Sequence, residues 1–170
     1  MGLLKKKVKF SVAPNHIGYL YKKNTFEKKL EPGIYEFRDS KNECFIYCIP
    51  LFQQFQLYYN QELLTKDNIA LRFSYHVFYK IIDPDKIMAL FNFTQGDSAL
   101  LTQINDFIHS LSQVAVREKI SSLISEEVNE KRNILTENLA AELNEKAKPM
   151  GIEITEITLR DLTSPKMIQD

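Results

Sequence analysis

Side chains that could perform catalytic or metal chemistry are few in this chain and far apart. The three histidines, His16, His76 and His109, fall in a predicted loop, a predicted strand and a predicted helix. The five glycines never come close enough together to form a phosphate-binding loop, and the HExxH, GxSxG and paired CxxC motifs do not occur. The sequence therefore predicts a protein that is not an enzyme, with no catalytic residue, no cofactor and no metal.

The two cysteines, Cys44 and Cys48, are too few for a disulfide framework and lack the spaced partners of a zinc site. On a strand, residues four apart share a face but lie about 13 Å from each other, which is too far for a disulfide bond. We expect reduced thiols, as is usual in the cytosol. The carboxylates gather where helix caps and solvated helix faces are predicted, and no pair stands out for acid–base catalysis.

Lysine is concentrated at the N-terminus. Residues 1–30 hold eight lysines against Glu27 alone, a net charge of +7, so the remaining residues sum to −7 because the whole chain is neutral. This asymmetry favours an anionic partner, either lipid or nucleic acid, although a merely solvated basic edge is an alternative. We expect the lysine pairs to share one face. The candidate membrane-contact residues are Leu3, Leu4, Lys5, Lys6, Lys7, Lys22, Lys23, Lys28 and Lys29.

A nucleic-acid partner is the weaker of the two alternatives. Aromatic residues alternate with lysines as they would in a base-stacking platform: Tyr19, Tyr21, Lys22, Lys23 and Phe26. However, no arginine precedes Arg38, and the sequence pI of 6.8 is far from that of a typical nucleic-acid-binding domain. We therefore expect lipid rather than nucleic acid.

No apolar run reaches the roughly 18 residues that a membrane-spanning helix requires. The longest, residues 44–52, is interrupted by Pro50. The lysines of the first seven residues are not followed by the apolar stretch of a signal peptide, and Lys6 stands where a myristoylation site prefers Ser or Thr. We expect a soluble or peripheral protein on the cytoplasmic side of a membrane.

The first half of the chain has the pattern of β-strands. Pro14-Asn15 and Pro32-Gly33 are turn signals, the second typical of a type II turn. Strict alternation of apolar and other residues over 68–82 predicts one long, half-buried strand. The remaining predicted strands cover residues 8–13, 17–21, 34–37, 44–49 and 52–59.

The second half has a helical period. Asp83-Pro84 predicts a helix start that continues to about residue 92, and Gly96-Asp97 introduces a long amphipathic helix. Ser125 is predicted to cap a third helix, which ends near residues 149–151. The apolar residues along this helix are Val128, Leu135, Leu139, Leu143 and Ala147.

A last strand follows over 152–162, with a bulge predicted where its apolar positions change parity between Ile154 and Ile157. The fold class is therefore α+β: an antiparallel sheet built mostly from the N-terminal half, covered by two or three helices and closed by a C-terminal strand. The predicted organisation is a basic segment (1–7), one domain (8–165) and the beginning of a C-terminal helix (166–170). Within the domain, 8–82 is β-rich, 83–150 is helical and 151–163 is the closing strand.

Several short motifs, taken in order, resemble those of the stomatin/prohibitin/flotillin (SPFH, band-7) family, in its slipin or stomatin-like branch. They are the L-x-P-G turn before Ile34, the Q-x-x-x-T-x-D segment from Gln61, the D-P helix start, an R-E pair in the long helix, and the closing G-I and D-L-x-x-P segments. The residues that carry the resemblance are Pro32, Gly33, Thr65, Asp67, Asp83, Pro84, Arg117, Gly151, Asp161 and Pro165.

This resemblance implies a non-enzymatic, membrane-associated scaffold that assembles with copies of itself and organises membrane proteins or lipids. An adaptor that docks a membrane protease or channel is the alternative. Family members usually carry an N-terminal apolar anchor and a C-terminal coiled coil, so we expect the parent protein to continue past Asp170. Self-association would use the sheet edge or Leu135, Leu139 and Leu143, unless these leucines pack in the core, which is the more frequent role of such residues.

Overall fold

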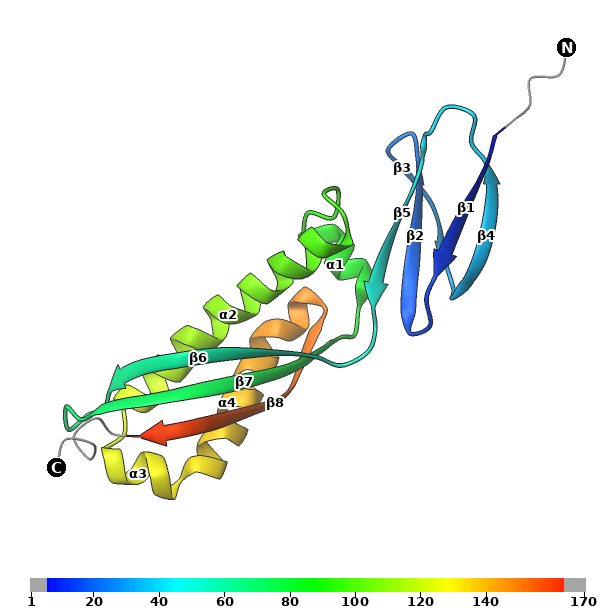
Figure 1. The fold of residues 1–170 in the computed structure, drawn as a ribbon. Coiled ribbons are helices and arrows are strands. Elements are labelled where there is room, and N and C mark those ends of the chain that lie inside the picture. The colour runs from blue at the N-terminus through cyan, green and yellow to red at the C-terminus, as the bar shows by residue number, and fades with distance from the viewer. Residues whose placement is uncertain (1–5, 164–170) are drawn as a thin grey trace, which may run out of the picture. The chain divides into compact units, whose positions relative to one another are not determined.

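The computed structural model describes residues 6–163, and the chain divides into two compact units (Figure 1). Unit 1 contains the residues up to Phe52 together with Asn92–Leu101, and unit 2 contains Gln53–Phe91 and the residues from Thr102 onward. The predicted roles of Leu3, Leu4, Lys5, Pro165 and the helix start at 166–170 lie outside the described residues.

Unit 1 is built from five antiparallel strands in two small sheets. One sheet pairs β1 with β4, and the other has the order β3-β2-β5. The strands are β1 (Lys7–Val12), β2 (His16–Lys22), β3 (Thr25–Leu30), β4 (Gly33–Arg38) and β5 (Cys44–Pro50).

The core of unit 1 lies between these two sheets. Val12, Leu20 and Leu30 are buried at its centre. Gly18 permits the close approach, because a Cβ at this position would lie only 2.8 Å from Cγ2 of Val12. Cys44, Cys48 and other partly buried side chains surround this cluster. Both cysteines are free thiols, and burial raises the pKa of each, which keeps them neutral.

Unit 2 is a three-stranded antiparallel sheet, of order β6-β7-β8, with helices packed on it (Figure 1). Its strands are β6 (Gln54–Leu64), β7 (Ala70–Ile81) and β8 (Ile152–Thr163). Its helices are α1 (Pro84–Leu90), α2 (Asp97–Ser121, whose first turn belongs to unit 1), α3 (Ser125–Glu130), α4 (Arg132–Ala147) and the 3₁₀ turn η1 (Lys148–Met150).

The alternation in β7 makes the core of unit 2, as predicted, but the strand is not half-buried along its whole length, because Ser74 and His76 on its other face are buried as well. Phe73, Tyr75 and Tyr79 are buried on the face that α2 covers. The Tyr75 hydroxyl lies 3.0 Å from Oγ of Ser112, and the Tyr79 hydroxyl donates to Oδ1 of Asn105 at 2.6 Å. Burial raises the pKa of Tyr79 to about 12, so this hydroxyl stays protonated and remains a donor.

The α+β class, the closing strand β8 and its bulge are confirmed, the bulge by a register shift between Phe78 and Tyr79 in the β7–β8 ladder. The prediction of one sheet is wrong, because the strands form three sheets in two units. The prediction also missed β3, whose residues are exposed except for Leu30, so it shows no apolar alternation. The single helix predicted from Ser125 is interrupted at Lys131.

Two turn predictions also need correction. Gly33 has a φ of 155°, which departs from the roughly +80° of a type II turn, although the chain does turn there. Strand β6 runs on to Leu64, five residues further than predicted (64 against 59), because Asn60 adopts a φ of 50° and a bulge between Tyr58 and Gln61 resets the register.

Candidate functional surfaces

The three histidines lie in three different elements of the structure. His16 lies at the start of β2, His76 is buried in β7, and His109 stacks on Tyr58 from α2, with ring centroids 4.4 Å apart. Among residues 6–163, no three His, Cys, Asp or Glu side chains come together as metal ligands would. Within the same range, no helix combines the length and the apolar character needed to cross a membrane.

Three segments that are distant in sequence bring basic side chains to one end of unit 1. The backbone N–H of Asp39 donates to the carbonyl of Lys6 at 2.8 Å, and that of Lys23 donates to the carbonyl of Glu43 at 3.1 Å. The start of β1, the β2–β3 turn and the β4–β5 loop therefore lie together. We call the exposed basic residues gathered there the basic end: Lys6, Lys7, Lys22, Lys23, Arg38 and Lys41.

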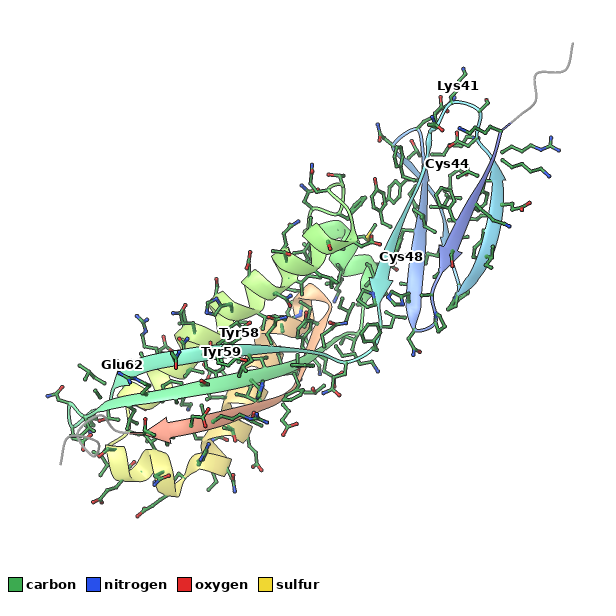
Figure 2. All side chains as sticks on the ribbon, in the orientation of Figure 1. Lys41, Cys44, Cys48, Tyr58, Tyr59 and Glu62 are labelled. Carbon is green, nitrogen blue, oxygen red and sulfur yellow. The ribbon has the colours of Figure 1, made fainter. Side chains whose placement is uncertain are left out.

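Sequence reasoning identified Lys6, Lys7, Lys22 and Lys23 but missed two members of the basic end, Arg38 and Lys41. Lys41 stands at the tip of the β4–β5 loop (Figure 2). The sequence contained a signal for both residues, because alternate turns in a run of antiparallel strands return to the same end of the sheet. The β4–β5 loop is therefore expected at the same end as the β2–β3 turn.

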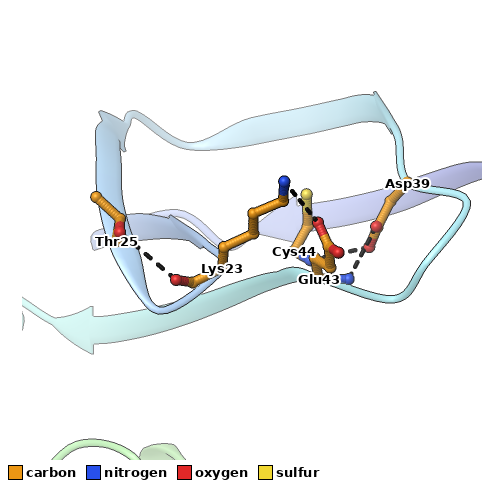
Figure 3. A network of polar contacts seen from close by, with 5 residues as sticks. All are labelled: Lys23, Thr25, Asp39, Glu43 and Cys44. Carbon is orange, nitrogen blue, oxygen red and sulfur yellow. Dashed lines mark hydrogen bonds and ion pairs between the residues drawn. The ribbon is translucent and has the colours of Figure 1, made fainter.

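A buried carboxylate shapes the loop that presents Lys41 (Figure 3). Oδ1 and Oδ2 of Asp39 accept the backbone N–H groups of Glu43 and Cys44 at 2.8 and 2.9 Å. These two hydrogen bonds hold the pKa of the Asp39 carboxyl below its usual range. Glu43 in turn lies 3.9 Å from the Lys23 ammonium. The basic end is therefore supported by a fixed loop.

The expectation that both lysine pairs share one face is wrong for Lys28 and Lys29. The Lys28 ammonium lies 5.4 Å from the ring centre of Phe37 in β4, whereas that of Lys29 lies 5.9 Å from the ring centre of Tyr19 in β2. Adjacent residues of a strand point to opposite faces of the sheet, so a pair of neighbouring lysines in β3 divides between the two.

Two exposed phenylalanines adjoin the basic end. Phe26 and Phe45 are 47% and 50% exposed, and both lie directly opposite Tyr21, next to Lys22 on β2. The rings of Tyr21 and Phe26 pack edge to face, with centroids 5.7 Å apart, and Tyr19 is buried. The aromatic residues that resembled a base-stacking platform are therefore packed on one another, which leaves no open row of faces for nucleotide bases.

Several residues of the motifs hold connections of unit 2 in place. The Thr65 hydroxyl donates to Asp67, and the Asp67 carboxylate accepts the backbone N–H and the hydroxyl of Ser125 at 3.1 and 2.9 Å. These hydrogen bonds lower the pKa of Asp67. Ser125 was predicted to cap its helix, but Asp67, 58 residues away, supplies the accepting oxygen.

Gly151 joins three elements. Its carbonyl accepts the backbone N–H groups of Ile82 and Asp83 at 2.9 and 3.2 Å, after β7 and before α1. Asp83 caps α1 through the N–H of Lys86, and Pro84 begins that helix, as predicted. Asp161 adopts a φ of 54° beside a register shift in β8.

Arg117 is exposed on α2, where it lines a cavity of about 150 Å³ together with residues of the β6 bulge. Leu135, Leu139 and Leu143 are buried. Their proposed role as an interface is wrong, because α4 packs this stripe into the core of unit 2.

Comparison with known proteins assigns these features to a family. The model of the SPFH domain / Band 7 family matches residues 10–170. A stomatin homolog of Pyrococcus horikoshii is 27% identical over 112 residues, 64% of this chain and 37% of its own. A stomatin-like protein of Caenorhabditis elegans is 26% identical over 110 residues, 65% and 31% of the two chains. The matched region thus spans less than two-fifths of either relative.

Proposed function

The chain belongs to the SPFH domain / Band 7 family, and we propose that it is a non-enzymatic scaffold domain. It binds peripherally to the cytosolic face of a membrane and assembles with copies of itself. In this proposal, the basic end of unit 1 touches anionic lipid headgroups, and unit 2 carries the contact between copies.

The observation that carries the membrane part is the composition of the basic end. Six exposed cationic side chains gather there. Among the nearby carboxylates, Asp39 is buried in backbone hydrogen bonds, and Glu43 lies beside Lys23. Each lysine near an anionic leaflet contributes about 1 kcal/mol, so several together hold a domain reversibly at the surface.

Phe26 and Phe45 add an apolar contribution to the same contact. Both residues are about half exposed and lie opposite Tyr21, close to the basic end, and aromatic residues near basic ones suit the boundary between headgroups and acyl chains. Burial of these rings in the interface would supply a part of the binding free energy that does not depend on salt.

Flotation with lipid vesicles tests the membrane part. We expect the chain to float with vesicles that contain phosphatidylserine and to remain at the bottom of the gradient with pure phosphatidylcholine vesicles. Failure to float with either composition would refute lipid binding. Equal flotation with both would show that charge is not the recognised property.

A further inference from the structure

The two edges of the unit 2 sheet differ in how they are protected. The order β6-β7-β8 makes β6 and β8 the edge strands. On β8, Oδ1 of Asn144 accepts the backbone N–H of Ile154 at 3.0 Å, and the Arg132 guanidinium donates to the carbonyl of Leu159. Side chains of α4 therefore occupy backbone groups that β8 would otherwise offer to another strand.

Apart from its bulge between Tyr58 and Gln61, strand β6 has features that natural proteins usually keep off an exposed edge. It is eleven residues long, and Glu62 is its one charged residue. Phe55 and Tyr59 on this strand are 61% and 67% exposed, and Leu64 is also exposed. Tyr59 and Glu62 can be followed along β6 in Figure 2. Edge strands are normally short, charged or covered, so an eleven-residue edge with one charge and three exposed apolar or aromatic side chains indicates a pairing surface.

The hydrogen bonds on β8 also determine which β6 residues face outward. The Leu159 carbonyl points away from β7 toward Arg132, so Leu159 and Tyr75 form a pair without mutual hydrogen bonds. Tyr75 therefore directs its backbone groups to its other partner, Tyr58. Because the direction alternates along an antiparallel strand, Phe55 and Leu57 present their N–H and C=O groups to the open side of β6.

We propose that β6 pairs antiparallel with β6 of a second copy of this chain, in a two-fold register centred on Leu57. The two three-stranded sheets would then form one continuous sheet. In this register, Phe55 faces the partner's Tyr59 on the outer face, twice by symmetry, and Gln56 faces the partner's Tyr58. Aromatic cross-strand pairs of this kind stabilise sheets, and no like charges meet.

The partner follows from the sequence of β6 itself. A two-fold contact requires a surface that matches its own copy, and a strand with aromatic residues placed symmetrically about Leu57 meets this requirement. Nε2 of Gln61 donates to the carbonyl of Tyr59 at 2.7 Å on the exposed surface, and the partner strand would replace this side-chain contact. The inference rests on the proposed function, since it names the surface through which the copies assemble.

A charge-pair experiment on the full chain tests both the surface and the register. In sedimentation velocity, we expect the wild type to form dimers. The double variant Phe55→Lys with Tyr59→Lys sets like charges opposite each other, and we expect its dimer dissociation constant to rise about tenfold or more. The double variant Phe55→Lys with Tyr59→Glu sets opposite charges there, and we expect it to dimerise more tightly than the first variant.

The matched control is Ile134→Lys, which adds a charge at a side chain of α4 that is 60% exposed, and it should leave dimerisation unchanged. Circular dichroism spectra equal to that of the wild type would verify that the variants fold. Dimers that persist unchanged in the first variant, or that are lost equally in both, would overturn the β6 pairing and leave self-assembly standing. A wild type that remains monomeric at about 1 mM, a weak-binding limit, would overturn both.

Discussion

His76 is a buried histidine in the middle of the longest alternating strand. Its ring packs against those of Phe55 and Phe78, with centroids 6.3 and 5.7 Å away, and Nδ1 lies 3.4 Å from the Thr158 hydroxyl. Burial, with a contribution from the charge of Arg160, lowers the pKa of His76 below its usual value of 6.5. The side chain is therefore neutral in the folded protein at physiological pH.

Acid should consequently destabilise unit 2 through His76. As the pH falls below 6.5, the unfolded chain takes up the proton on this histidine before the folded chain does. The contribution of neutral His76 to stability is therefore complete above pH 6.5 and is lost as the pH falls through the lower pKa of the folded state. Urea unfolding at about pH 7.5 and about pH 5 measures the loss. His76→Gln should reduce it, and an equal loss in the wild type and this variant would contradict the prediction.

Thr65 is a residue of the motifs whose hydroxyl has a structural role. It is buried, its Oγ1 accepts the backbone N–H of Ile69 at 3.1 Å, and it donates to Asp67. Thr65→Val keeps the shape but leaves the Ile69 N–H without this acceptor, so we expect a loss of about 1–3 kcal/mol in the free energy of unfolding. Urea titration measures it, and Thr65→Ser, which restores the hydroxyl, should recover most of the loss.

At the scale of elements, the connection at Gly151 depends on a backbone that only glycine adopts easily. Gly151 has a φ of 85°, and a Cβ there would lie 2.5 Å from the Asp83 carbonyl oxygen. Gly151→Ala should therefore destabilise unit 2 by about 1–3 kcal/mol. Gly96, which belongs to unit 1, has a φ of 103° with nothing within 4 Å of its Cβ position. Gly96→Ala therefore introduces backbone strain without a collision, and we expect it to cost unit 1 less than Gly151→Ala costs unit 2. Equal losses in urea unfolding would show that the collision is unimportant.

Elements with strong local signals could be predicted from the sequence. Three features depend only on neighbouring residues, and the structure contains all of them: the alternation over β7, the helix start at Asp83-Pro84 and the parity change in β8. Strand β3 could not be found, because an edge strand with exposed charges has no period. The division of the strands between two units also has no local signal, since it is decided by which faces pack together.

The candidate surfaces were predictable in part for the same reason. The lysines were visible as a concentration of charge, but their directions depend on strand geometry, which separates Lys28 from Lys29. Arg38 and Lys41 join Lys22 and Lys23 only because the β4–β5 loop returns to the β2–β3 turn. The stripe on α4 showed that the helix has an apolar face, but the tertiary structure decides that this face is core.

At the scale of the whole molecule, charge and assembly would act together. Dimers joined through β6 would carry two basic ends, and two weak membrane contacts on one particle bind more tightly than either alone when both reach the surface. Variants that abolish dimerisation without touching the basic end should therefore weaken vesicle binding as well. Vesicle titration of the double variant Phe55→Lys/Tyr59→Lys measures this effect. The control is the double variant Phe55→Lys/Tyr59→Glu, which differs from it only at position 59.

The strength of membrane binding should follow the lysines of the basic end and the salt concentration. Replacing Lys22, Lys23 and Lys41 by Gln removes about 1 kcal/mol each, so the partition coefficient on phosphatidylserine vesicles should fall about a hundredfold. Replacing Lys66, Lys80 and Lys146, which are exposed in unit 2, makes the same change of net charge and should have little effect.

Salt should distinguish the two kinds of contact at the basic end. Raising the ionic strength from about 0.1 M to about 1 M shortens the screening length from about 10 Å to about 3 Å, so the contribution of the lysines should disappear. Binding that remains belongs to Phe26 and Phe45, and replacing both by Ala should remove it while leaving the salt dependence of the rest unchanged. If the unit 2 lysine variant lost as much binding as the basic-end variant, net charge alone would explain vesicle binding, and the basic end would not be the contact.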